Sequence, residues 1–161
     1  MKKEIVIKSA YSALKKLTPL QFDCGKICNG KCCKGDADTG MLLFPGEEKL
    51  IDKDINIIER DGAFYAICNG SCNRSYRPLS CRIFPLFPVI KNDDGKEYIE
   101  VTFDSRADCP LVNEEYKISR SFCNKVKRAG KYLLLNEETE AFYRNLSAEI
   151  EEIDQLKLLL K

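Results

Sequence analysis

The sequence predicts an α+β fold in a single small domain, with a loop-rich cysteine core and short β-hairpins packed against N-terminal and C-terminal helices. Two observations carry this prediction. Apolar residues recur at helical spacing near both ends of the chain, and two central segments show strand patterns on either side of a turn signal. The 161 residues, of which 44% are hydrophobic and 32% charged, fit one globular domain covering residues 1–161.

The first forty residues are expected to form a helix followed by a loop. Apolar residues recur at near-helical spacing over residues 5–17, with lysines between them: Ile5, Ile7, Ala10, Tyr11, Leu14 and Leu17. This pattern predicts a short amphipathic helix. Residues 23–40 contain several glycines among the cysteines, and glycine permits tight turns. We therefore expect a loop that wraps around a metal in this segment.

A short helix is predicted next, beginning near Pro45. The proline and the acidic pair Glu47 and Glu48 are typical of a helix N-terminus, where the helix dipole favours negative charge. Its buried stripe would consist of Leu50, Ile51 and Ile55.

Two hairpins are predicted in the central part of the chain. Residues 57–67 surround Asp61-Gly62, a favoured two-residue turn, and the second strand of this hairpin would end at Cys68. Residues 85–91 and 97–104 flank a second turn signal at 92–95. Because proline cannot donate to a strand ladder, Pro85 and Pro88 make the first of these strands an edge strand or an irregular extended segment.

Helices are predicted for residues 111–161. Asn113, followed by two glutamates, predicts a helix N-terminus, with Tyr116, Phe122, Cys123 and Val126 on one face. Gly130 is expected to break or bend this helix. A final helix is predicted from about Asn136, with one apolar side: Phe142, Leu146, Ile150, Ile153 and Leu160. That side would pack on the core, or alternatively bind a partner or form a dimer.

Charge and hydropathy argue against two classes of partner. The formal net charge is +1 with both signs interspersed, which gives no indication of a nucleic-acid surface. No apolar run approaches the roughly 18 residues needed to span a membrane, and the N-terminus lacks a secretory pattern. We therefore expect a cytoplasmic protein. In a reducing compartment, clustered cysteines are more typical of metal or redox sites than of disulfides.

Nine cysteines and no histidine are the most informative feature of the composition. Four form a C-x3-C-x3-C-C run and three a C-x3-C-x8-C run; the first set is Cys24, Cys28, Cys32 and Cys33, and the second is Cys68, Cys72 and Cys81. Thiolates are strong ligands for zinc and iron, so a site here would be built mainly from sulfur, as a mononuclear centre or an iron–sulfur cluster. The odd number of cysteines and the absence of a C-x-x-C pair argue against a disulfide framework and a redox dithiol.

The adjacent residues Cys32 and Cys33 leave the arrangement open. Their side chains diverge, so they could serve two metals, or one could support the other's site; a vicinal disulfide is a further alternative.

Arg77 and Arg82 flank Cys81, where positive charge favours thiolate, although ordinary surface salt bridges would also explain them. The carboxylate pairs Glu47-Glu48 and Asp93-Asp94 are expected on the surface, and no acid/base pair, catalytic triad or phosphate loop is recognisable.

The cysteine runs, with Glu47 or Glu48 between them, resemble the zinc- or iron-chelating cysteine-cluster family, together with the later Cys109-Pro110 and the segment Arg77-Pro78-Leu79-Ser80-Cys81-Arg82-Ile83-Phe84-Pro85. That family is characterised by a C-x2-C-x2-C-C run, a later cysteine pair and an R-P-x-x-C-R-x-x-P segment. The resemblance covers roughly residues 20–110, and the first run departs from it by its x3 spacings. It implies eight metal-ligating cysteines: Cys24, Cys28, Cys32, Cys33, Cys68, Cys72, Cys81 and Cys109. Cys123 lies outside the set and is expected to be a buried thiol on a helix face.

Three functions are compatible with the sequence. The first is a metal-binding protein without catalysis, in which zinc or iron is structural, stored or sensed. The second is a catalytic iron–sulfur or metal protein, because the flagellin lysine-N-methylases resemble this family in their cysteine cluster, although no S-adenosylmethionine loop is recognisable here. The third is a zinc-stabilised interaction module whose C-terminal helices bind a protein partner; an exposed apolar patch on the last helix would favour it.

Overall fold

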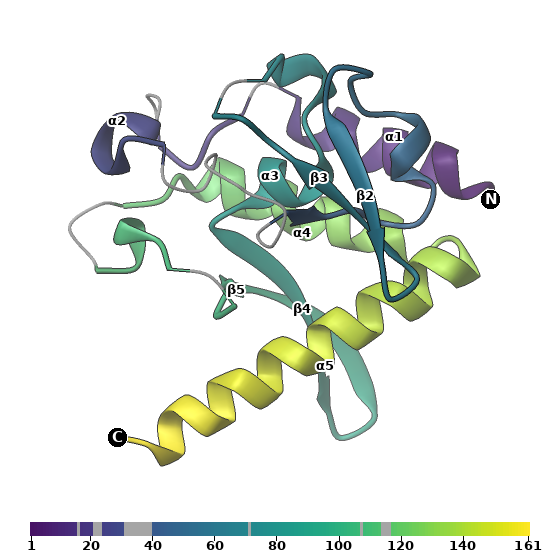
Figure 1. Ribbon diagram of the computed structural model, residues 1–161. Helices are drawn as coiled ribbons and strands as arrows, with labels where there is room; N and C mark the ends of the chain where they lie inside the picture. The colour runs from purple at the N-terminus through teal and green to yellow at the C-terminus, as the bar shows by residue number, and fades with distance from the viewer. Residues whose placement is uncertain (16, 21–23, 31–39, 71, 107, 114–116) are drawn as a thin grey trace.

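The computed structural model describes the chain from Met1 to Lys161 except residues 16, 21–23, 31–39, 71, 107 and 114–116 (Figure 1). Its elements follow in the order α1 (Lys3–Leu14), α2 (Gly25–Cys28), β1 (Met41–Leu42), η2 (Glu47–Lys49), β2 (Asn56–Arg60), β3 (Ala63–Ile67), η3 (Arg74–Tyr76), α3 (Leu79–Ile83), β4 (Leu86–Asp93), β5 (Lys96–Phe103), η4 (Pro110–Asn113), α4 (Arg120–Leu133) and α5 (Glu137–Leu159), where η denotes a 3-10 turn. Helices combined with two small antiparallel sheets confirm the predicted α+β class.

Both predicted hairpins are confirmed. Strands β2 and β3 pair antiparallel around Asp61 and Gly62, whose φ angles are 51° and 77°. Strands β4 and β5 pair around Asp94 and Gly95, with φ angles of 48° and 83°. Positive φ at both central residues is the requirement of a type I′ turn, which matches the twist of the flanking strands. Pro88 lies within β4, which is an edge strand because its sheet has only two strands.

Helix α1 packs against α4 in the antiparallel sense. The backbone N–H of Ser119, which caps α4, donates to Pro19 O at 2.9 Å, and Asn136 Nδ2, beyond the other end of α4, donates to Met1 O at 2.9 Å. The helix predicted over residues 5–17 is thus present, but it begins and ends earlier. Ile5 and Leu17 are 50% and 39% exposed, so the expected apolar stripe was too wide.

Two predictions about the helix after Cys109 were wrong. Asn113 is the last residue of the turn η4, and α4 begins at Arg120, where the Ser119 side chain accepts a hydrogen bond from Phe122 N. Gly130 does not break α4, which continues to Leu133. A Cβ built on Gly130 would lie 2.8 Å from the Tyr143 hydroxyl and 2.9 Å from Pro88 Cβ, so glycine allows α4, α5 and β4 to approach closely.

The final helix was predicted correctly. Asn136 caps α5 by accepting hydrogen bonds from the backbone N–H groups of Glu138 and Thr139. Leu146 and Ile150 are buried, as the pattern indicated. Leu160, which was also placed on the apolar side, is 87% exposed. The second half of α5 therefore carries apolar side chains outside the core.

The main core joins both ends of the chain to the second hairpin. Its largest fully buried side chains include Ile7 and Leu14 of α1, Phe87 of β4, Phe122 of α4 and Tyr143 of α5. A second, smaller cluster lies under the first hairpin and contains Leu43, Ile51 and Ala66. In the part of the chain that the structure describes, no helix is long and apolar enough to cross a membrane.

Candidate metal centre

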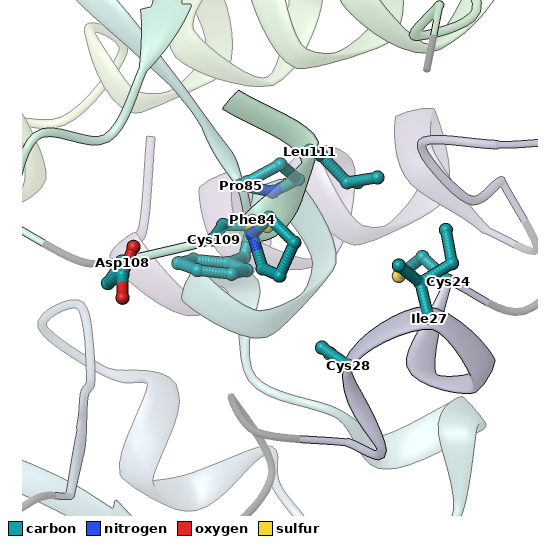
Figure 2. A pocket seen from close by; sticks show the side chains of 9 residues that line it. Cys24, Ile27, Cys28, Phe84, Pro85, Asp108, Cys109 and Leu111 are labelled. Carbon is teal, nitrogen blue, oxygen red and sulfur yellow. The ribbon is translucent and has the colours of Figure 1, made fainter. Parts of the chain in front are cut away.

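Three of the predicted ligands line one cavity. Cys24 precedes α2, Cys28 ends it, and Cys109 immediately precedes η4 (Figure 2). The cavity has a volume of about 20 Å³, which is enough to hold one water molecule. All three cysteines are half-buried. Residues at sequence positions 24 and 109 thus meet at a site that no local pattern could have indicated.

Local backbone geometry brings these thiols to the cavity. Ile27 N donates to Cys24 O at 3.0 Å, which closes a single helical turn between the two cysteines. That turn ends at Asn29 and Gly30, whose φ angles of 55° and 66° are left-handed. The glycine-rich segment 23–40 was predicted to be a loop; its described part contains this one turn, and residues 31–39 lie outside the described residues. On the opposite side, Val112 N donates to Cys109 O at 3.1 Å.

The cavity walls are largely apolar, and this affects the protonation of the thiols. The cavity is also lined by Ile27, Phe84, Pro85, Pro110 and Leu111. Figure 2 shows Cys28 projecting from α2 toward the wall that carries Phe84 and Cys109. Burial raises the pKa of the Cys109 thiol, and the negative charges of Cys28 and Asp108 raise it further, although Leu111 N–H opposes the shift. Without a cation nearby, Cys109 therefore favours its neutral form.

The second cysteine pair lies at a different place. Cys68 directly follows β3, as predicted, and lines a surface pocket of about 680 Å³ together with Cys72. Asp52, Asp54 and Asn73 also line this pocket. It shares no lining residue with the cavity of Cys24, Cys28 and Cys109. Cys24 and Cys28 of the first run therefore line one pocket, and Cys68 and Cys72 of the second run line another.

Cys81 lies on α3, beside a buried polar cluster formed by Tyr11, Glu47 and Arg82. Glu47 is fully buried. Its Oε1 accepts a hydrogen bond from the Tyr11 hydroxyl at 2.5 Å and another from Leu79 N, while its Oε2 accepts one from Phe44 N at 2.8 Å. Burial raises the pKa of the Glu47 carboxyl, and these three donors act in the opposite direction.

Arg82 completes the polar cluster from above the Tyr11 ring. Its guanidinium carbon lies 4.1 Å from the ring centroid, its Nε donates to Arg77 O at 2.6 Å, and its terminal nitrogen donates to Ser75 O at 2.9 Å. Arg82 thus orders the backbone before Cys81. The interpretation of Arg82 as an ordinary surface salt bridge was wrong. Cys81 is close enough to affect the pKa values of both Tyr11 and Arg82.

The polar cluster corrects two further expectations. Glu47 and Glu48 were expected on a charged surface, yet Glu47 has no exposed side-chain area. The helix predicted to start there is only the turn η2, which ends at Lys49. Because the partners Tyr11 and Leu79 are 36 and 32 residues away, no periodicity around Glu47 could have revealed its burial.

Cys123 occupies the position expected of a structural thiol. It lies on α4, is half-buried and packs against the main core. Burial raises the pKa of its thiol. It lines neither of the cysteine-containing pockets described above.

The donor set fits a soft metal in its chemistry but does not form a closed site in the described residues. Within residues 1–161 less the gaps named above, no three Cys, Asp or Glu side chains converge closely enough to hold an ion. Cys32 and Cys33, the last two members of the first run, lie outside the described residues. The cavity of Cys24, Cys28 and Cys109 is therefore a partial ligand set.

Comparisons with protein-family models, with curated proteins and with solved structures find no match to this chain. The likeness to the zinc- or iron-chelating cysteine-cluster family consequently rests on the cysteine spacing and the segment around Cys81.

Proposed function

We propose that this chain is a cysteine-rich metal-binding protein that coordinates zinc or iron through thiolates. The observation that carries the proposal is the shared cavity of Cys24, Cys28 and Cys109. Three thiols from two distant segments of the chain line this one cavity, and thiolates are strong ligands for zinc and iron.

The chemistry of the donors favours a soft or borderline cation. With no histidine in the chain, a tetrahedral site would take sulfur donors, and Cys32 or Cys33 would supply the fourth. Asp108 also lines the cavity and offers an oxygen donor. Cys68, Cys72 and Cys81 remain candidates for a second metal.

The bound metal would cross-link α2 to the segment before η4. Because a thiol must lose its proton to bind a metal, uptake would release protons, and the raised pKa of Cys109 makes that release part of the binding reaction. The site's thiols need a reducing compartment, so we place the protein in the cytoplasm. This assignment requires no catalytic step.

A zinc-stabilised interaction module is a second candidate. The observation that favours it is the exposure of Leu156, Leu158, Leu159 and Leu160, which are 52%, 69%, 81% and 87% exposed. Metal binding and partner binding are compatible, because the cysteine cavity and these leucines involve different elements.

Elemental analysis of protein purified without oxygen, with visible absorption and electron paramagnetic resonance spectra, tests the proposal. We expect at least one zinc or iron per chain, and loss of that metal with a lower unfolding temperature on chelation. A protein that is purified without zinc or iron, takes up neither on reconstitution, and unfolds at the same temperature with and without chelator would contradict it.

A further inference from the structure

Helices α4 and α5 carry opposite net charge. Helix α4 contains five cations, Arg120, Lys125, Lys127, Arg128 and Lys131, and no acidic residue. Helix α5 contains seven acidic residues and two basic ones. The net charge of +1 conceals this separation, because the two helices nearly cancel. The charges of the sequence are thus separated between these two helices.

A groove runs along the junction of α1 and α4. Its volume is about 340 Å³, and its lining includes small side chains of α1, namely Ser9, Ser12 and Ala13. Small side chains let another element approach the helix backbone closely. The exposed side chain of Ile5 of α1 and the side chain of Tyr132 of α4 also line the groove.

Cations line the groove as well. Lys8 comes from α1, and Lys125 and Arg128 come from α4. Arg128 Nε donates to the Tyr132 hydroxyl at 3.2 Å, which holds the guanidinium beside the groove. Among the described residues, neither Lys8 nor Lys125 is in an ion pair. The groove therefore combines apolar contact area with positive charge that is not neutralised within the chain.

The end of α5 has the complementary character. Ile153, Leu156 and Leu160 follow the i, i+3, i+7 spacing by which an amphipathic helix fills a groove. Glu149 and Glu152 lie on the same side of the helix by sequence position and are exposed. Figure 1 shows these C-terminal turns projecting away from the rest of the ribbon.

We propose that the end of α5 in one copy of this chain docks into the α1–α4 groove of a second copy. The apolar stripe contacts Ile5, Ala13 and Tyr132, and the glutamates face Lys125 and Arg128. The lengths agree, because the 12 residues of α1 and the 11 residues at 149–159 each extend about 17–18 Å as helix.

A reciprocal pair makes this contact twice. Each copy supplies one groove and one α5 end, so a two-fold arrangement satisfies both. Stable interfaces bury about 1,200–2,000 Å² in total, which requires only about 600–1,000 Å² from each of the two contacts. The charge pairing would make association weaker at high salt.

Charge reversal tests the proposal on the full metal-loaded chain in reducing buffer. Sedimentation and light scattering should show the wild type as a dimer. Lys125→Glu with Arg128→Glu, or Glu149→Lys with Glu152→Lys, should each weaken association about tenfold or more. The decisive sample is an equimolar mixture of the two double variants, which should form a heterodimer because both contacts again pair opposite charges. Lys127→Glu with Lys131→Glu, on the same helix but outside the groove lining, is the matched control and should remain dimeric.

Several outcomes would overturn the proposal. One is a wild type that stays monomeric at a concentration on the order of 10⁻⁴ M, because a contact with a micromolar dissociation constant would be mostly dimeric there. Another is failure of the mixed variants to associate while both keep the circular dichroism of the wild type. A third is tight binding of a labelled oligouridylate by a monomeric wild type, lost in the groove variant, which would assign the groove to nucleic acid.

Discussion

The hydroxyl of Tyr11 donates a 2.5 Å hydrogen bond to Oε1 of Glu47, and this contact joins the first helix to a fully buried carboxylate. Oε1 also accepts from Leu79 N, the first residue of the helix that carries Cys81. One oxygen therefore couples α1 to α3. This coupling, rather than surface charge, is the structural role of Glu47.

Glu47→Ala should strongly destabilise the fold. The substitution leaves three buried donors without an acceptor, and each unsatisfied group costs about 1–3 kcal/mol. We expect a loss of about 3–5 kcal/mol in the free energy of unfolding, measured by urea denaturation. Glu59→Ala, at an exposed strand position, is the control and should change stability by less than about 0.5 kcal/mol. Equal losses in the two variants would contradict this role.

Glu47 should also make stability depend on pH. Because burial raises the pKa of its carboxyl in the folded state, the folded chain retains a proton that the unfolded chain loses. The contribution of Glu47 to stability should therefore be largest below the ordinary glutamate pKa and fall as pH rises from there through the raised value. Tyr11 and Arg82 are the ionisable groups facing it.

The difference between wild type and Glu47→Gln isolates this effect. The glutamine side chain does not titrate, while the cysteines and any bound metal are common to both proteins. As pH increases above about 4.5, the reference pKa of the carboxyl, the free energy of unfolding of the wild type should fall relative to that of Glu47→Gln. A difference that is constant from pH 4 to pH 8 would show that Glu47 does not titrate in that range.

Arg82→Lys should loosen the segment before Cys81. A lysine ammonium cannot reproduce the planar contacts of guanidinium with Arg77 O, Ser75 O and the Tyr11 ring. We expect a loss of about 1–3 kcal/mol and faster hydrogen exchange over residues 74–80. Arg74→Lys, on an exposed residue of η3, provides the comparison. Unchanged exchange in Arg82→Lys would show that its hydrogen bonds do not order this segment.

Local chemistry explains which parts of the fold could be predicted from the sequence. Asp61-Gly62 and Asp94-Gly95 specify hairpins because positive φ is required at the turn itself. Asn136 marks the start of α5 because its cap involves only the next three residues. The N-terminus predicted at Asn113 was wrong, because α4 is capped by Ser119 instead.

The candidate site was predictable in composition and not in arrangement. Cysteine spacing indicated metal ligands, yet the meeting of Cys24 and Cys28 with Cys109 depends on how distant segments pack. The separation of Cys68 from that cavity depends on the first hairpin. Spacing along the chain determines which residues are neighbours in one turn, whereas tertiary packing determines which turns meet.

Gly130→Ala should destabilise the protein although alanine favours helices. Alanine is better than glycine by about 1 kcal/mol in a helix interior. Here the new Cβ would lie 2.8 Å from the Tyr143 hydroxyl and 2.9 Å from Pro88 Cβ. We expect overpacking of about 1–3 kcal/mol to outweigh the helix gain, giving a lower unfolding temperature. Ser121→Ala, at an exposed position of α4, is the control and should be neutral or stabilising. Stabilisation by Gly130→Ala would contradict the prediction and show that α5 can move away from α4 to make room for the new Cβ.

Cysteine substitutions should separate ligands from structural thiols. Cys28→Ser and Cys109→Ser each remove a donor from the shared cavity, so metal per chain and unfolding temperature should fall together. Cys81→Ser should also lower metal content if the second run contributes ligands. Cys123→Ser is the matched control, because its thiol packs against the core on α4 away from both pockets, and its metal content should equal that of the wild type. Wild-type metal content in Cys28→Ser and Cys81→Ser would refute the ligand assignment, and a clear loss in Cys123→Ser would add that residue to the ligands.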